Sequence, residues 1–168
     1  MDDSADVDVI VEAPEWEALG LDALAVEVCT AALTALGLPA QRFEIALLAC
    51  DDARIATLNA DFRDSPQPTN VLSWPATHID LPLGGMPALP DPAPDAPRHE
   101  LGDIAIAYQT CVREAHDQGK PVQDHLSHLL VHAVLHLLGF DHINDADAVQ
   151  MEGLETRILA NLGVPDPY

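Results

Sequence analysis

A cluster of histidines near residue 130 has the residue type and spacing best suited to chemistry. Six of the eight histidines lie between His116 and His142, and the four from His125 to His136 are spaced by 3, 4 and 4 residues. A helix would place these four side chains on one stripe. Two of them, His132 and His136, would be offset by about 40° around the helix axis and about 6 Å along it, so their imidazoles could bind one ion.

A glycine after this stretch allows a third histidine to join the pair. His132, His136 and His142 form the motif H-x-x-x-H-x-x-G-x-x-H. Gly139 suits the left-handed position after a helix, which would turn the chain back toward the other two histidines. Three neutral imidazoles leave the fourth position of a tetrahedral zinc for water, as in catalytic zinc sites. Such a zinc lowers the pKa of water to about 7 and polarises phosphoryl or carbonyl oxygens, so we expect hydrolysis.

The neighbours of the three histidines leave some roles open. Metzincin peptidases share the spacing, but there a Glu, the general base, follows the first histidine. Here that residue is Ala133, which argues against proteolysis unless a base comes from elsewhere. His125 and His128 either orient a ligand or pack the helix, and Asp141 either orients an imidazole or stabilises the turn.

The elements that must position these residues follow from hydrophobic periodicity. Apolar alternation and short apolar runs predict strands, whereas helical spacing closed by Gly and Pro predicts helices. The predicted strands are residues 7–11, 43–50, 71–75 and 103–108, and the predicted helices are 19–36, 52–62, 109–118, 121–138 and 145–162. This pattern indicates an α+β (mixed α/β) fold, a single four-stranded mixed sheet packed with about five helices, with the zinc site at the end of a helix. It leaves the strand order open.

The length and the proline distribution define the domain organisation. A chain of 168 residues and 18.0 kDa suits one domain over residues 1–168. The stretch of about 75–98 contains half of the chain's 14 prolines and predicts a loop. Loops of this length are usually functional or disordered, so we expect it to be mobile.

Charge and cysteine content exclude several classes of protein. A formal net charge of −21 rules out a broad basic face for nucleic-acid binding. The three cysteines are too few and too scattered for a disulfide framework or a metal cluster, and they suit a reducing compartment. The acidic N-terminus lacks the features of a signal peptide, and the most apolar run is too short to span a membrane. We therefore expect a cytoplasmic protein.

Four segments of the chain carry a further pattern: LNADFRDSPQPTNVLSWP (58–75), LGDIAIA (101–107), HLLVHAVLHLLGFDH (128–142) and MEGLETRILANLGVPDPY (151–168). In this order they resemble the segments of the YbeY family of endoribonucleases, which mature ribosomal RNA. The resemblance covers about residues 43 to 168 and leaves the first strand and helix weakly matched.

The resemblance implies a single-strand-specific, zinc-dependent endoribonuclease. Its function would be 3′-end maturation of small-subunit (16S) rRNA and ribosome quality control. The implied cofactor is one Zn²⁺ per chain, held by His132, His136 and His142, and the implied catalytic residues are Arg63 and His132. Implied partners are single-stranded rRNA, small-subunit ribosomal proteins and an assembly GTPase, but neither DNA nor a membrane.

The role of Arg63 also has its own physical rationale. Its guanidinium can contact two phosphate oxygens and stabilise the charge that develops on a phosphodiester under attack. The alternative is a structural ion pair with one of the 28 acidic residues. Thr69, Asn70 and Ser73 stand where the family has polar residues near its cleft, or they serve only turns and strand ends.

Two residues depart from the family pattern. Ala133 replaces the usual Gly, which adds a methyl group beside the first ligand and could crowd the substrate. Trp74 replaces the usual Phe, and we expect it to pack in the core rather than stack on a base.

Two rival functions remain open. One is an assembly factor that binds ribosomal components with a mainly structural zinc, and the other is a zinc peptidase-like hydrolase without the usual Glu. The sequence identifies no general base, and it does not choose between attack by water and attack by a 2′-hydroxyl. The strong negative charge is in tension with RNA binding, so either a small positive cleft suffices or partners deliver the RNA. The partners that the resemblance implies favour delivery.

Overall fold

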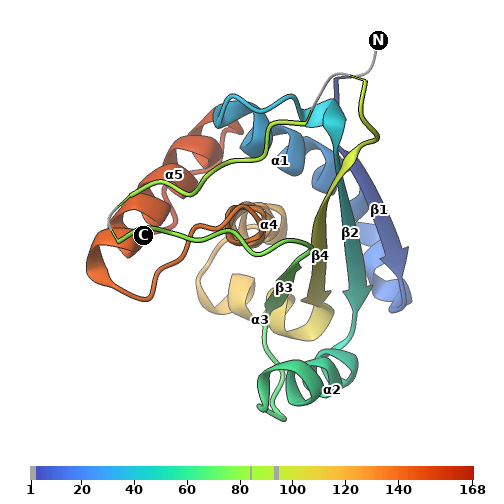
Figure 1. Cartoon of the computed structure of the whole chain (residues 1–168). Coiled ribbons are helices and arrows are strands. Elements are labelled where there is room, and N and C mark those ends of the chain that lie inside the picture. Colours follow the sequence, from blue (N-terminus) through green and yellow to red (C-terminus); the bar gives the residue numbers. More distant parts are fainter. Residues whose placement is uncertain (1–2, 84, 93–94) are drawn as a thin grey trace.

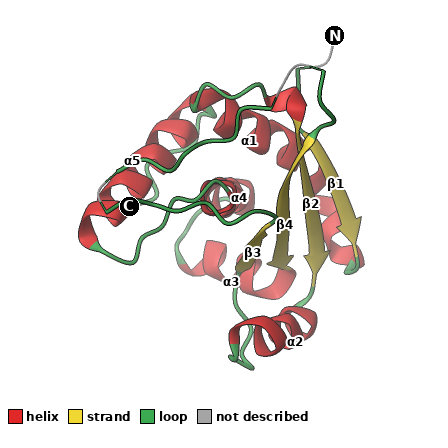
Figure 2. Ribbon diagram, viewed as in Figure 1, coloured by secondary structure: helices red, strands yellow, loops and turns green. Residues whose placement is uncertain are grey.

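The fold combines one mixed β-sheet with helices on both of its faces (Figures 1 and 2). The computed structural model describes residues 3–83, 85–92 and 95–168. These residues form four strands, β1 (Asp6–Val11), β2 (Phe43–Cys50), β3 (Val71–Pro75) and β4 (His99–Ala107), and five α-helices, α1 (Leu21–Ala35), α2 (Asp52–Arg63), α3 (Tyr108–Asp117), α4 (Val122–Leu137) and α5 (Asp145–Asn161). Short 3-10 helices cover Pro14–Leu19 and Ala40–Arg42. The α+β architecture with a single mixed sheet is as predicted.

The strand order is β1-β2-β4-β3. The pairs β1–β2 and β2–β4 are parallel, whereas β3 runs antiparallel to β4. Parallel neighbours need crossovers, which α1 and α2 provide together with the segments around them. The antiparallel strand β3 lies at the sheet edge that faces α4.

Successive side chains of a strand point to opposite faces of the sheet, so the apolar side chains form two cores, one on each face. The larger core contains alternate β2 residues such as Leu47 and lies against α1, α4 and α5. The smaller core contains Cys50 and Ala105 and lies under Ile55 of α2. Both sheet faces are therefore covered, and the helix that carries the histidines belongs to the larger core.

Helix α4 is the central helix of the larger core. It contacts α1, α3, α5 and β3, and Figure 1 shows it nearly end-on between the sheet and α5. Leu126, Leu130 and Val134 on its buried side have 0% exposure. This packing fixes the rotation of α4 about its own axis.

One predicted strand was wrong in its bounds. We expected residues 103–108, but β4 begins at His99 and ends at Ala107, and Tyr108 starts α3. The register against β2 shifts between Glu44 and Ile45, so β4 has a bulge just before Gly102. The bulge reverses the in–out alternation, and this hides the first residues of the strand from a period-two pattern. The two 3-10 helices were also not predicted.

The proline-rich segment after β3 forms neither helix nor strand among its described residues, 76–83, 85–92 and 95–98. Figure 2 shows it as a loop that leaves β3, passes α5 and returns to β4. The Sδ atom of Met86 lies 3.2 Å from Gln150 Nε2 on α5, and Arg42 donates a hydrogen bond to the carbonyl of Ala96. The described residues of this segment therefore lie in a loop, and its mobility stays a prediction.

The three cysteines are free and buried. Burial raises the pKa of Cys29 to about 12, and it is also the main cause that raises the pKa of Cys50 and of Cys111 to about 12. These thiols are therefore protonated and act as small apolar side chains. In the described part of the chain, no helix is both long and apolar enough to cross a membrane.

Gly102 provides a test of the bulge. Its φ is +146°, and an added Cβ would lie 2.2 Å from the carbonyl oxygen of Trp74 in β3. We expect Gly102→Ala to lower the free energy of unfolding by about 2–4 kcal/mol, because strand β3 must move away from β4. Gly153→Ala is the control, since its added Cβ meets no atom within 4 Å apart from its chain neighbours and the backbone of its own helix, and alanine favours a helix. Urea denaturation measures both, and equal stability of Gly102→Ala and the parent chain would contradict this account.

Candidate metal centre

The last two turns of α4 position the first two histidines. His132 and His136 lie one turn apart on the side of α4 that faces away from its most buried residues, and both are half-buried. Ala133 and Val134, between them, are buried in the core. The predicted stripe is thus confirmed, because α4 includes both residues and its rotation is fixed by packing.

A Schellman turn at the end of α4 positions the third histidine. Gly139 has a φ of +103° and donates its N–H to the carbonyl of His136 at 3.0 Å. The N–H of Phe140 donates to the carbonyl of Leu135 at 3.0 Å. These are the two hydrogen bonds of a Schellman motif, which reverses the chain. The predicted left-handed role of Gly139 is confirmed, and His142 is brought back beside α4.

The three imidazoles converge. One ring nitrogen from each of His132, His136 and His142 lies within 4.8 Å of the other two. The ring centres of His132 and His136 are 4.5 Å apart, and each lies 5.1 Å from that of His142. The Nε2 atoms of His132 and His136 are 3.0 Å apart. This group of nitrogens can hold one metal ion.

The outer ring nitrogens determine which atoms face the centre. The backbone carbonyl of Phe140 can only accept, so His136 Nδ1, 3.0 Å away, carries the hydrogen. His132 Nδ1 likewise donates to the carboxylate of Glu155. Both Nε2 atoms then present lone pairs to each other at 3.0 Å. A cation between them is the natural partner for two such lone pairs.

The surroundings of His136 favour its neutral imidazole. Burial first, and then the charges of His132 and His142, lower the pKa of His136 to about 4, although Asp141 and the hydrogen bond to Phe140 act to raise it. A neutral imidazole is the form that binds metal. The Oδ1 atom of Asp141 accepts the backbone N–H of His142 at 2.7 Å, so this residue stabilises the turn, one of the two roles considered for it.

Glu155 of α5 is a member of the site that sequence reasoning missed. It is 0% exposed, and its carboxylate accepts hydrogen bonds from His132, His128 and Tyr168. Burial by itself would raise the pKa of Glu155, but these three hydrogen bonds lower it to about 2. The sequence did contain a sign of this role, because the acidic Glu155 occupies a core-facing position of α5 between Met151 and Ile158. A buried carboxylate needs such partners.

The three histidines line a cleft with a volume of about 800 Å³. Arg63, the last residue of α2, lines the same cleft. Its Nη2 donates to the carbonyl of Ser73 at 2.7 Å. Among the described residues, its guanidinium thus pairs with a backbone oxygen rather than with a carboxylate, and the ion-pair alternative is not observed. Thr69, Asn70 and Ser73 line the cleft, and Asn70 also accepts the backbone N–H of Val71 at the start of β3, so both of the positions considered for these residues occur.

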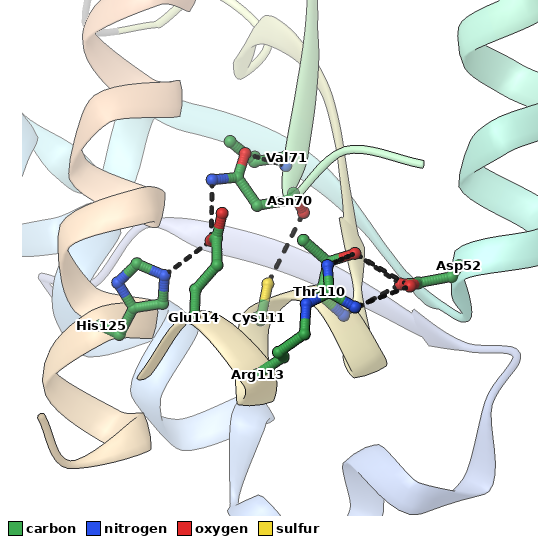
Figure 3. A network of polar contacts seen from close by, with 8 residues as sticks. All are labelled: Asp52, Asn70, Val71, Thr110, Cys111, Arg113, Glu114 and His125. Atoms are coloured by element: carbon green, nitrogen blue, oxygen red, sulfur yellow. Dashed lines mark hydrogen bonds and ion pairs between the residues drawn. The ribbon is translucent and has the colours of Figure 1, made fainter. Parts of the chain in front are cut away.

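Polar contacts behind the cleft hold its wall in place (Figure 3). The Oε1 atom of Glu114 on α3 lies 3.0 Å from Asn70 Nδ2 and 2.9 Å from His125 Nε2. Asp52, at the start of α2, accepts from the backbone N–H of Thr110 at 3.0 Å. These contacts tie the helix of Arg63 and the start of β3 to α3 and α4. His125 is therefore a packing residue of the cleft wall and stands outside the three-histidine group.

The two departures from the family pattern have clear positions. Ala133 is 1% exposed and lines the cleft, so its methyl group replaces the carboxylate that a metzincin would place there. Trp74 packs against the smaller core, as expected, and its ring lies 5.6 Å from that of Phe62 in an edge contact. Trp74 thus supports α2.

Comparisons with known proteins agree with this geometry. Residues 11–163 match the family model described as Endoribonuclease YbeY. The chain is 58% identical over 97% of its length to the protein of that name from Jannaschia sp. (strain CCS1), of which it covers 99%. It is 54% identical over 96% of its length to the one from Cereibacter sphaeroides, of which it covers 98%. The solution structure of TM1509 from Thermotoga maritima shares the fold, with a TM-score of 0.60, 18% identity and coverage of 93% of this chain and 88% of that one.

Glu155 makes the metal site testable without an activity assay. We expect Glu155→Gln to weaken Zn²⁺ binding about 10- to 100-fold, because a neutral amide no longer orients His132 as strongly. Calorimetric titration of metal-free protein with Zn²⁺ measures this effect. Glu152→Gln, one turn away and exposed, is the matched control and should bind Zn²⁺ as the parent does. Unchanged affinity in Glu155→Gln would show that the carboxylate serves packing alone.

Proposed function

Because the chain belongs to the endoribonuclease YbeY family, we propose that it is a metal-dependent endoribonuclease that cleaves single-stranded RNA in the cleft of the three histidines. The name shared by the relatives supports an endoribonuclease role. One observation carries the metal dependence. Two imidazoles whose Nδ1 atoms are engaged as donors approach each other to 3.0 Å through their Nε2 atoms.

The finer proposal follows the family resemblance. The physiological substrate is the 3′ end of small-subunit (16S) rRNA, and the same activity serves ribosome quality control. The cofactor is one Zn²⁺ per chain, with His132, His136 and His142 as ligands. The protein acts in the cytoplasm as a single domain, together with small-subunit ribosomal proteins and an assembly GTPase.

Different residues of the cleft have different roles in hydrolysis. When bound, zinc supplies a Lewis acid and lowers the pKa of a coordinated water to about 7. Glu155 holds His132 in the tautomer that presents Nε2 to the centre. Arg63 has several N–H groups besides the one that bonds Ser73, and these offset negative charge on the phosphate oxygens. The nucleophile is either water or a 2′-hydroxyl, and no general base is assigned.

Charge supports the delivery of substrate by partners. The chain carries a net charge of −21, and Arg63 is the one Lys or Arg among the described residues that line the cleft. Long-range attraction of RNA is therefore absent, and phosphate contact is local. We propose that ribosomal components hold the RNA while the cleft cuts it.

Removal of one histidine tests the central claim. We expect His136→Ala to lose both high-affinity Zn²⁺ binding and cleavage of a single-stranded oligoribonucleotide, because two imidazoles alone hold the ion weakly. Metal content by mass spectrometry and gel-based cleavage assays measure the two effects. His116→Ala, an exposed histidine on α3, should retain both. Cleavage by metal-free His136→Ala would refute the mechanism, and loss of metal with normal ribosome maturation in cells would favour the assembly-factor role.

Arg63 is tested by a pair of substitutions. We expect Arg63→Ala to lower kcat/KM about 100-fold, the effect of removing one preorganised donor to a developing charge. Arg63→Lys keeps the charge but loses the planar fork, so we expect it to restore only part of the rate. Zn²⁺ affinity should stay at the parent value in both variants. Parent-like cleavage by Arg63→Ala would remove this residue from the mechanism.

A further inference from the structure

One residue with a phenol ring is exposed to solvent in the cleft. Among the described residues that line the cleft, the phenyl and phenol rings belong to Phe140 and Tyr168. Phe140 is 1% exposed, whereas Tyr168 is 60% exposed. Exposed aromatic side chains usually mark a binding role when they line a cleft, because the apolar ring gains free energy only when something covers it.

The ring of Tyr168 is held in place from three sides. Its hydroxyl donates to the buried carboxylate of Glu155 and lies 3.2 Å from His128 Nε2. Its backbone N–H donates to Asp166 at 2.9 Å, and Asp166 in turn accepts from Thr156 of α5 at 3.3 Å. The ring also makes an edge contact with His128, with centres 5.4 Å apart and planes at 85°. A ring fixed in this way loses little conformational entropy when a ligand covers it.

The same hydrogen-bond network connects this ring to the proposed metal ligands. Glu155 contacts both Tyr168 and His132, so one carboxylate sets the position of the ring relative to the three histidines. The ring centres of Tyr168 and His128 are 5.4 Å apart and those of His128 and His132 are 6.5 Å apart, so a group on the Tyr168 ring lies near the three histidines.

Charge indicates which kind of contact the ring can add. Arg63 is the single Lys or Arg among the described residues of the cleft, and the chain has a net charge of −21. Contacts to phosphates can therefore supply little affinity. Stacking of a base on an aromatic ring does not depend on charge and tolerates any sequence.

We propose that Tyr168 is a stacking platform for one unpaired nucleobase of the RNA strand whose phosphodiester lies at the three histidines. This inference rests on the proposed endoribonuclease function and adds a base-binding subsite to it. A base inside a duplex is already stacked on its neighbours, so the platform favours single-stranded RNA.

The test compares binding of intact and abasic RNA by the full-length protein. A fluorescent single-stranded oligoribonucleotide is titrated with metal-free protein, so that binding is measured without cleavage. The ionic strength is about 0.15 M, where salt screens repulsion between the acidic chain and RNA beyond about 8 Å. We expect Tyr168→Leu to weaken binding about 5- to 100-fold, the usual contribution of one stacked base. Tyr168→Phe keeps the ring and should lose much less. Phe62→Leu is the matched control, because Phe62 is 63% exposed but lies outside the cleft lining.

Abasic oligonucleotides show whether the lost contact is a stacked base. Removal of the base at the correct position should weaken binding to the parent protein by the same factor, with no further loss in Tyr168→Leu. Equal binding of intact RNA by Tyr168→Leu and the parent would overturn the proposal. An equal penalty for Tyr168→Leu on intact RNA and on every abasic RNA would overturn it as well.

Separate measurements keep this proposal distinct from the proposed function. Zn²⁺ affinity and thermal unfolding of Tyr168→Leu show whether loss of the contact with Glu155 disturbs the metal site or the fold. If the parent protein binds RNA through Tyr168 but does not cut it, the base-binding subsite is supported and the nuclease function is refuted. If Tyr168→Leu cuts RNA with the same KM as the parent protein, the nuclease function is supported and the base-binding subsite is refuted.

Discussion

The burial of α4 on most of its sides is the constraint on which the site depends. Leu126, Leu130 and Val134 are inaccessible to solvent, and the helix is enclosed by α1, α3, α5 and β3. A rotation of α4 by one residue, about 100°, would drive His132 into the core and expose leucine. The packing of the hydrophobic core therefore determines the direction in which the imidazoles of His132 and His136 point.

The buried carboxylate of Glu155 adds polar contacts to the apolar packing that positions His132. Glu155 would be costly in an apolar interior if it lacked partners, and three donors compensate for its burial. Because it comes from α5 and meets side chains of α4 and of the C-terminal segment, it joins three parts of the chain at one point. The packing of α5 on α4 thus has a polar centre that specifies its register.

The sequence was most informative where structure is local. The intervals between His132, His136 and His142, with Gly139 as the turn residue, were sufficient to predict that the three imidazoles converge, because helix geometry and a left-handed glycine determine it. Glu155 was missed because its partners lie 13 to 27 residues away along the chain. The start of β4 was missed for a related reason, since a bulge is defined by the partner strand. Resemblance to a family identified Arg63, which periodicity alone does not connect to the histidines.

The contacts of the proline-rich segment have a consequence for how homologous chains can differ in length. A Cβ at Gly139 would lie 3.0 Å from both Ile79 and Pro87, so this part of the segment rests on the turn that carries the third histidine. The backbone N–H of Ala76 is also bonded to the carbonyl of Leu101. Insertions and deletions between Ala76 and Pro87 would therefore be transmitted to the turn. Length changes between Pro87 and Ala96, before β4 begins, are expected to disturb the turn with the third histidine less.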